Sequence, residues 1–176
     1  ETIAKIMGTE AVTGPKKVAI VRCRGDLNRC VLHFDYQGVK DCKSAVLAGN
    51  GDKACQYSCL GFGDCQKACP FGAITITEDR LAVVNEDKCT GCGQCVAACP
   101  RSVISLITTD HAVHRTCSAM ERGRVMRDNC IAGCLGCGKC ERACKFDALH
   151  LKNNLPHIDF TRCVDCMQCA DACPTG

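Results

Sequence analysis

Short segments that alternate between apolar and polar residues dominate the chain. Residues 73–84 alternate on either side of a polar turn at 78–80, and residues 149–160 do the same around Asn153-Asn154. Alternation places every second side chain on one face of a strand, and short polar turns join antiparallel neighbours. The pattern therefore predicts two β-hairpins, each with one apolar face.

The N-terminal third of the chain has a different pattern. Apolar residues concentrated at 17–22 and 31–36 predict two strands, and residues 41–48 predict a short helix. Polar, alanine-containing segments at 66–68 and 141–143 predict helices of one or two turns. The chain is thus expected to be an α+β protein of small elements, which opens with a small α/β segment.

Cysteine is the residue that sets this sequence apart. The 176 residues include 21 Cys, five Phe, two Tyr and no Trp. So few large side chains cannot fill a sizeable core, and modules with thin cores need covalent or coordinate links. An odd cysteine number without a signal peptide argues against a fully paired secreted scaffold and favours reduced thiols that hold metal. No run of about 18 apolar residues occurs, so nothing in this sequence is expected to span a membrane.

The cysteines form a repeat with an offset of about 75 residues. In each copy, a first run of cysteines is followed by a hairpin and then by a second run that ends in Cys-Pro. The paired runs are Cys55-x3-Cys59-x5-Cys65-x3-Cys69 with Cys130-x3-Cys134-x5-Cys140-x3-Cys144, and 89–100 with 163–174. The predicted organisation is an N-terminal α/β segment (1–52), a first dicluster ferredoxin-like module (53–109), an Arg-rich connector (110–129) and a second such module (130–176). The second module is expected to be cut short inside its last motif.

The spacing of these runs points to iron–sulfur chemistry. In a Cys-x2-Cys-x2-Cys run three thiolates converge on one cluster, and a fourth Cys three residues later binds the other cluster of a pair. This rule predicts four 4Fe–4S clusters in two bacterial ferredoxin-like modules. Their expected ligand sets are Cys55/Cys59/Cys65/Cys99, Cys69/Cys89/Cys92/Cys95, Cys134/Cys137/Cys140/Cys173 and Cys144/Cys163/Cys166/Cys169.

The first run departs from the regular pattern. Phe62 stands where the second copy has Cys137, so the first set lacks one ligand, and Cys55 is expected to supply it. The alternative is a three-cysteine site that holds a 3Fe cluster, with Cys55 a free thiol. In the second copy Lys145 replaces the proline after Cys144, which removes no ligand.

Five cysteines remain outside these sets: Cys23, Cys30, Cys42, Cys117 and Cys130. Their spacing matches no metal motif, and buried or free thiols are the expected interpretation. An alternative is a fifth metal site that uses Cys23, Cys30 and Cys42. Cys130 is interpreted as a relic of the position that Cys55 fills in the first copy.

Other functional classes are less consistent with the sequence. Structural zinc sites use two cysteine pairs separated by a longer loop, whereas these runs follow the x2-x2-x3 spacing of clusters. A cluster with four thiolates is anionic, so the formal charge of +3 gives no reason to expect nucleic-acid binding. No phosphate-binding glycine loop precedes a helix, so no nucleotide or flavin site is expected either. The Arg-rich connector is interpreted as a solvated linker. The alternative is that its arginines guide an acidic ferredoxin to the first or last cluster.

Several segments are more specific than the generic ferredoxin motifs. They are residues 17–23, Tyr36-x-Gly38-x3-Asp41-Cys42, residues 55–65 with the ending Leu-Gly-Phe-Gly-Asp-Cys, and the runs 134–140 and 163–174. Together they closely resemble the B subunit of the Rnf complex, and the resemblance covers essentially the whole chain.

The resemblance implies a function. Rnf is a membrane-bound ferredoxin:NAD oxidoreductase that couples electron flow to Na⁺ or H⁺ translocation. Its B subunit takes electrons from reduced ferredoxin and passes them to other subunits on the cytoplasmic side of the membrane. The chain alone is not assigned an enzymatic activity, and a membrane anchor and a further iron–sulfur domain are expected upstream of Glu1. The alternative is a polyferredoxin-type subunit of a soluble hydrogenase or formate dehydrogenase.

Overall fold

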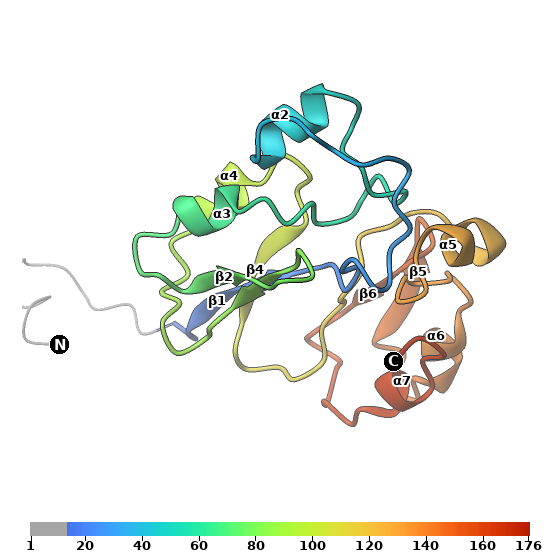
Figure 1. Ribbon diagram of the computed structural model, residues 1–176. Helices are drawn as coiled ribbons and strands as arrows, with labels where there is room; N and C mark the ends of the chain where they lie inside the picture. Colours follow the sequence, from blue (N-terminus) through green and yellow to red (C-terminus); the bar gives the residue numbers. More distant parts are fainter. Residues whose placement is uncertain (1–13) are drawn as a thin grey trace, which may run out of the picture.

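The computed structural model describes residues 14–176, and in it short helices and strands form two lobes (Figure 1). The strands are β1 Lys17–Val21, β2 Ile74–Ile76, β3 Ala82–Val84, β4 Ile104–Thr108, β5 Leu149–Lys152 and β6 Leu155–Ile158. The helices are α2 Cys42–Leu47, α3 Asp64–Lys67, α4 Gln94–Ala98, α5 Gly123–Asn129, α6 Lys139–Ala143 and α7 Gln168–Asp171. The first lobe contains β1–β4 with α2–α4, and the second contains β5, β6 and α5–α7.

Three two-stranded antiparallel sheets organise the lobes. β2 pairs with β3 and β5 pairs with β6, which confirms both predicted hairpins. β1 pairs with β4 from Lys17↔Thr108 to Val21↔Ile104. The N-terminal segment therefore contributes a strand to the first module, although residues 1–52 were expected to form a unit of their own. After β1 the chain runs toward the second lobe before it returns to α2 (Figure 1).

The main core of the first module is small and contains cysteine. Ala19, Ile74, Val103 and Ile104 are buried in one cluster with cysteines from both runs of the module. Ala19, Ile74 and Ile104 are the buried residues that β1, β2 and β4 contribute to this cluster. A core of this size needs the metal sites beside it for cohesion.

The predicted strand at 31–36 is wrong, whereas the predicted helix at 41–48 is confirmed as α2. The segment 31–36 makes one isolated bridge, Leu32↔Lys53, and the side chains of Val31, Leu32 and Phe34 are exposed. Apolar residues alone do not make a strand where no neighbouring strand completes the ladder. The strand β4 and the helix α5 were not predicted.

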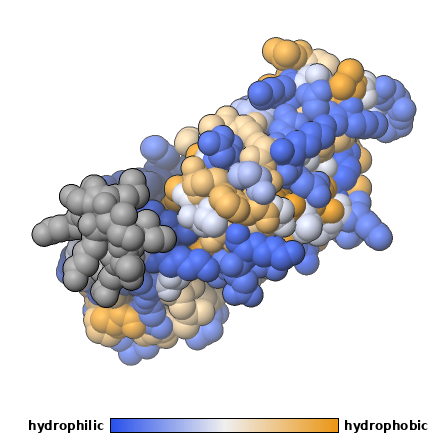
Figure 2. All heavy atoms as spheres, turned by 90° about the vertical axis from the view of Figure 1, so that its left-hand side faces the viewer, coloured by the Kyte–Doolittle hydropathy of each residue, from blue (hydrophilic) through white to orange (hydrophobic). Residues whose placement is uncertain are grey.

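The surface mixes apolar and polar residues. Figure 2 shows one face on which hydrophobic residues lie in several patches between hydrophilic ones. None of the helices within residues 14–176 combines the length and the apolar character that crossing a membrane requires.

Candidate metal centres

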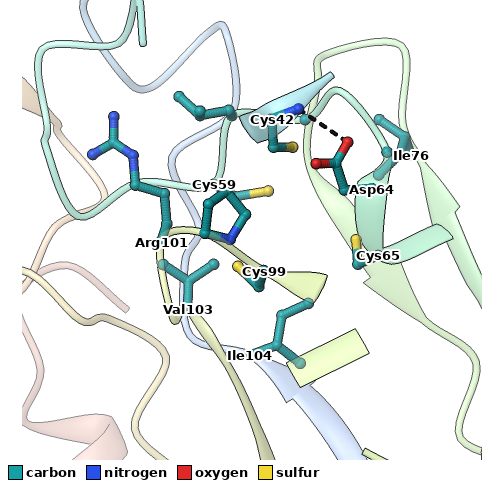
Figure 3. Close-up of a pocket in the computed structure, with 13 residues that line it drawn as sticks. Cys42, Cys59, Asp64, Cys65, Ile76, Cys99, Arg101, Val103 and Ile104 are labelled. Carbon is teal, nitrogen blue, oxygen red and sulfur yellow. Dashed lines mark hydrogen bonds between the residues drawn. The ribbon is translucent and has the colours of Figure 1, made fainter. Parts of the chain in front are cut away.

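Four cysteines line a cavity beside the core of the first module (Figure 3). They are Cys42, Cys59, Cys65 and Cys99, and their sulfurs face the space between them. The cavity has about 340 Å³ of empty space, its open mouth included. Its other walls are largely apolar and come from β2, β4 and the loop before β4. Four convergent thiols in an apolar wall fit a 4Fe–4S cluster.

The first turn of α2 positions Cys42 in this cavity. The Asp41 carboxylate caps the helix by accepting the backbone N–H of Ser44 at 2.6 Å. Asp64, at the start of α3, accepts the backbone N–H of Cys42 at 3.0 Å and that of Lys43 at 3.2 Å. These bonds hold the start of α2 against the start of α3, which carries Cys65.

The structure does not bring Cys55 into this set. Cys55 is buried in a different cluster, beside Cys30 and Cys130. The backbone explains the placement: the N–H of Ala54 donates to the carbonyl of Val31 at 2.7 Å, which holds Cys55 close to Cys30. The prediction from sequence missed Cys42 because this residue lies outside the cysteine run, and no spacing motif links it to Cys59.

Phe62, at the position where the second module has Cys137, is a packing residue. Its ring lies 5.4 Å from the ring of Tyr36, and the guanidinium of Arg80 lies 4.2 Å above it. The aromatic pair and the stacked cation fill the place where a fourth thiolate of the run would stand.

The second set is brought together as predicted. Cys69, Cys89, Cys92 and Cys95 line a cavity of about 300 Å³, open mouth included. The Cys89 sulfur accepts the backbone N–H of Ala19 at 3.3 Å, and the Cys69 sulfur accepts that of Ala73 at 3.4 Å. Backbone donors of this kind stabilise thiolate charge, as cluster ligands require.

The second module repeats this arrangement. Cys134, Cys137, Cys140 and Cys173 line a cavity of about 320 Å³, open mouth included. In the fourth predicted set, Cys144 accepts the backbone N–H of Ala148 at 3.4 Å, which matches the bond between Cys69 and Ala73. Burial raises the pKa of Cys169, and the charges of Cys163 and Cys166 raise it further.

The electrostatics of the cavities affect metal loading. Burial, together with the charges of Cys59, Cys42 and Cys99, raises the pKa of Cys65 to about 12. Burial raises the pKa values of Cys42 and Cys134 as well. These thiols are therefore protonated at neutral pH without metal, and iron must displace their protons when it binds.

A half-buried arginine lines the first cavity. Arg101 has two side-chain nitrogens, Nε and Nη1, that are buried without a hydrogen-bond partner among residues 14–176. A guanidinium beside the cavity offers positive charge and hydrogen-bond donors to an anionic ligand. The unpaired nitrogens of Arg101 therefore support the assignment of an anionic cluster to this cavity.

Two family models for a 4Fe–4S dicluster domain match this chain. One matches residues 53–106, and the other matches 88–148 and again 133–176. The matches cover both cysteine modules and include every cysteine of the predicted sets.

Three relatives align with nearly the whole chain, and each is named as the B subunit of its complex. The chain is 43% identical over 172 residues to the B subunit of the Na⁺-translocating ferredoxin:NAD⁺ oxidoreductase complex of Acetobacterium woodii, covering 98% of this chain and 52% of the relative. It is 46% identical over 178 residues to the B subunit of the proton-translocating ferredoxin:NAD⁺ oxidoreductase complex of Clostridium ljungdahlii. That alignment covers 100% of this chain and 63% of the relative.

The third relative is the B subunit of the ion-translocating oxidoreductase complex of Methanosarcina acetivorans, 38% identical over 172 residues, with 98% and 65% covered. The chain thus spans between about half and two thirds of the length of these relatives. The resemblance to the Rnf B subunit seen in the sequence is confirmed.

Proposed function

The chain belongs to the family of 4Fe–4S dicluster proteins, and from this premise we propose that it is the electron-relay part of an Rnf-type B subunit. The observation that carries the proposal is the set of three cavities, each lined by four cysteines drawn from separate segments. When bound, 4Fe–4S clusters supply one-electron steps between the 2+ and 1+ states at potentials that the protein sets. The protein's part is to hold the clusters and tune them.

The proposed ligand sets differ from the sequence prediction in one residue. Cys42 replaces Cys55 in the first set, because Cys42 lines the cavity and Cys55 does not. The four sets are Cys42/Cys59/Cys65/Cys99, Cys69/Cys89/Cys92/Cys95, Cys134/Cys137/Cys140/Cys173 and Cys144/Cys163/Cys166/Cys169.

Residues around the thiolates set the environment of each cluster. Backbone N–H groups of Ala19, Ala73 and Ala148 donate to ligand sulfurs, which raises a cluster's potential. At the first site Arg101 places a positive charge, which favours the reduced, more negative state of a cluster. The apolar wall of the same cavity, which includes Val103, disfavours the reduced state because it keeps water away from the negative charge of the cluster.

We propose reduced ferredoxin as the electron donor and the other subunits of a membrane-bound, ion-translocating oxidoreductase as the acceptors. The names of the relatives support this assignment, since two of them belong to ferredoxin:NAD⁺ oxidoreductase complexes. A peripheral position on the cytoplasmic side of the membrane follows from it. The polyferredoxin alternative predicts instead that the intact protein purifies with a soluble oxidoreductase.

The first test is iron and acid-labile sulfide per chain, measured after purification without oxygen. Four clusters give at least about 16 of each. Zinc in place of iron would refute the relay. With iron bound, loss of the visible absorbance on mixing with reduced ferredoxin tests the donor, and a chain that dithionite reduces but ferredoxin does not would refute that part of the proposal.

The ligand assignment has a matched control. Cys42→Ser is expected to lose about four iron atoms per chain, or one if a 3Fe cluster remains. Cys30→Ser makes the same chemical change at a cysteine outside every proposed set and is expected to lose none. Full iron content in Cys42→Ser would overturn the first set.

A further inference from the structure

The five cysteines left outside the four sets gather in one place. Four of them, Cys23, Cys55, Cys117 and Cys130, line a cavity of about 270 Å³ with its open mouth included, close to the volumes of the three cavities above. They come from four separate segments of the chain, which the fold brings together around a small core of buried residues. The fifth, Cys30, is buried in the same core.

Two of the four sulfurs that line this cavity accept backbone hydrogen bonds. Cys23 accepts the N–H of Gly25 and that of Cys59, both at 3.3 Å. Cys117 accepts the N–H of Cys134 at 3.3 Å. Backbone donors to the sulfurs of Cys23 and Cys117 stabilise thiolate charge, as do the donors to Cys69, Cys89 and Cys144 at the sites above.

The cavity follows the internal repeat. Cys55 and Cys130 are equivalent positions of the two copies, each four residues before a ligand of its own module, Cys59 and Cys134. The N–H of Cys59 donates to Cys23, and the N–H of Cys134 donates to Cys117. Each half of the protein thus supplies one pair of thiols in the same relation to its own module. The site lies where the two modules meet.

Two further features suit a ligand at this point. The Ser58 hydroxyl lines the cavity and is buried without a hydrogen-bond partner among residues 14–176, although buried hydroxyls are normally paired. A Cβ at Gly25 would lie 3.2 Å from the Cys130 sulfur and 3.6 Å from the Cys23 sulfur, so only glycine leaves this wall open.

The size of the cavity favours a cluster over a single ion. Within residues 14–176 no three His, Cys, Asp or Glu side chains converge on a single-ion position, either here or at the dicluster cavities. The central cavity resembles the dicluster cavities in this respect. A 4Fe–4S cluster binds its four thiolates at separate iron atoms, whereas one tetrahedral zinc requires all of its sulfurs within about 2.3 Å of the same metal.

We propose that Cys23, Cys55, Cys117 and Cys130 hold a fifth 4Fe–4S cluster between the two dicluster modules. Its role as the link between the modules rests on the proposed electron relay, whereas the site itself rests on the cavity. The hydrogen bonds from Cys59 and Cys134 place it next to the first and the third ligand sets. The Arg-rich connector, which carries Cys117, is then part of a metal site.

Cys30 is the natural control. It faces Cys130 in an isolated antiparallel bridge and is buried in the same core, but it does not line the cavity. Ser at position 30 is nearly isosteric with Cys. The same pair defines the competing state, a disulfide between Cys30 and Cys130 that would leave the cavity without a fourth ligand.

The test is iron and sulfide content of the intact chain, loaded without oxygen, in Cys23→Ser, Cys117→Ser and Cys30→Ser. The wild type and Cys30→Ser are expected to hold about 20 iron atoms, and the other two about 16. Electron paramagnetic resonance of the reduced proteins should show one cluster signal fewer in Cys23→Ser and Cys117→Ser, with the remaining signals unchanged. The unchanged signals would show that both modules are still folded.

Three outcomes would overturn the proposal. About 16 iron atoms in the wild type, unchanged in every variant, would remove the fifth cluster and leave the four-cluster relay intact. If Cys30→Ser loses as much iron as Cys23→Ser, the proposed ligand set is wrong. Peptide mapping that finds Cys30 joined to Cys130 in the protein purified without oxygen would establish the disulfide instead. Absence of iron altogether would instead refute the proposed function.

Discussion

Replacing Arg80 tests whether a buried ion pair holds the first module together. The Arg80 guanidinium makes two hydrogen bonds to the Asp52 carboxylate, at 2.7 and 2.9 Å, and two to the carbonyl of Leu60, at 3.1 and 2.9 Å. The Asp52 side chain is only 2% exposed. The ion pair thus joins the β2–β3 turn to the segment before the first cysteine run.

Arg80→Met keeps the length of the side chain and its packing on Phe62 but removes every donor. Asp52 is then left as a buried charge without its partner, which costs about 3–5 kcal/mol. The double variant Asp52→Leu/Arg80→Met removes both charges and should be less destabilised than Arg80→Met alone, because no unpaired charge remains.

Cluster loss makes unfolding irreversible, so the assay is a rate. Bleaching of the visible absorbance is followed in guanidinium with an iron chelator present. If the lost free energy acts on the barrier to unfolding, 3 kcal/mol corresponds to about a hundredfold faster bleaching. A rate within about threefold of wild type would refute the stabilising role of the pair, since that is under 1 kcal/mol.

The pH dependence gives an internal check. Burial raises the pKa of Asp52, but the hydrogen bonds and charge of Arg80 outweigh it, so the folded pKa is lowered. A lowered pKa contributes stability above the unfolded value of about 3.9, and that stability is lost only as pH falls through the folded value. The ratio of the two bleaching rates should therefore be constant between about pH 6 and 8.

Four further substitutions probe two glycines and two polar side chains beside the proposed clusters. Gly91→Ala would place a Cβ 2.5 Å from the Lys17 carbonyl at a φ of +69°, whereas Gly72→Ala, at +59°, meets no atom within 4 Å. Gly72→Ala should cost about 1–2 kcal/mol of backbone strain and Gly91→Ala clearly more, measured as the temperature of cluster loss. Ser58→Ala should lower the midpoint potential of one cluster and leave the others unchanged in a redox titration, because a donor is lost. Arg101→Leu should lower the potential of the first cluster by about 60 mV for each 1.4 kcal/mol of lost charge stabilisation, read in the same titration.

Local spacing explains why much of the candidate site could be predicted. In a run such as 89–95 three sulfurs must converge, because the loop between them is too short for any other arrangement. The fourth ligand of each regular run follows from the same rule, and the structure brings Cys69 and Cys173 to the expected cavities. Both hairpins were predictable for a similar reason, since their turns are short and their alternation is regular.

Cys42 could not be predicted from spacing. It lies 17 residues before Cys59 in the sequence. It reaches the cavity only because α2 begins at Cys42 and the Asp64 carboxylate accepts the backbone N–H of Cys42. The prediction of a strand at 31–36 was wrong for a related reason. A strand forms only beside a pairing partner, and the local sequence does not indicate which segment that partner is. Such contacts are made by the tertiary fold.

The assignment of Cys55, in contrast, could have been questioned from the sequence. Its equivalent in the second copy, Cys130, precedes a run in which Cys134, Cys137 and Cys140 already provide three ligands. If the two copies use equivalent positions in equivalent ways, Cys55 shares the role of Cys130, and the ligand missing at Phe62 must come from elsewhere in the chain. The repeat thus argues for a separate role shared by Cys55 and Cys130.

That shared role also gives a reason for the fusion of two modules in one chain. Cys59 and Cys134 each line the cavity of their own module, while their backbone N–H groups donate to sulfurs of the central cavity. One half of the protein alone could supply only two of the four central cysteines. The proposed central cluster would therefore form only when both halves are present and docked, and its ligands would join the two halves as metal sites do in small proteins. Two modules that met only through Arg-rich linker residues would have no such requirement, and their cysteines outside the ferredoxin runs would have no reason to share one cavity.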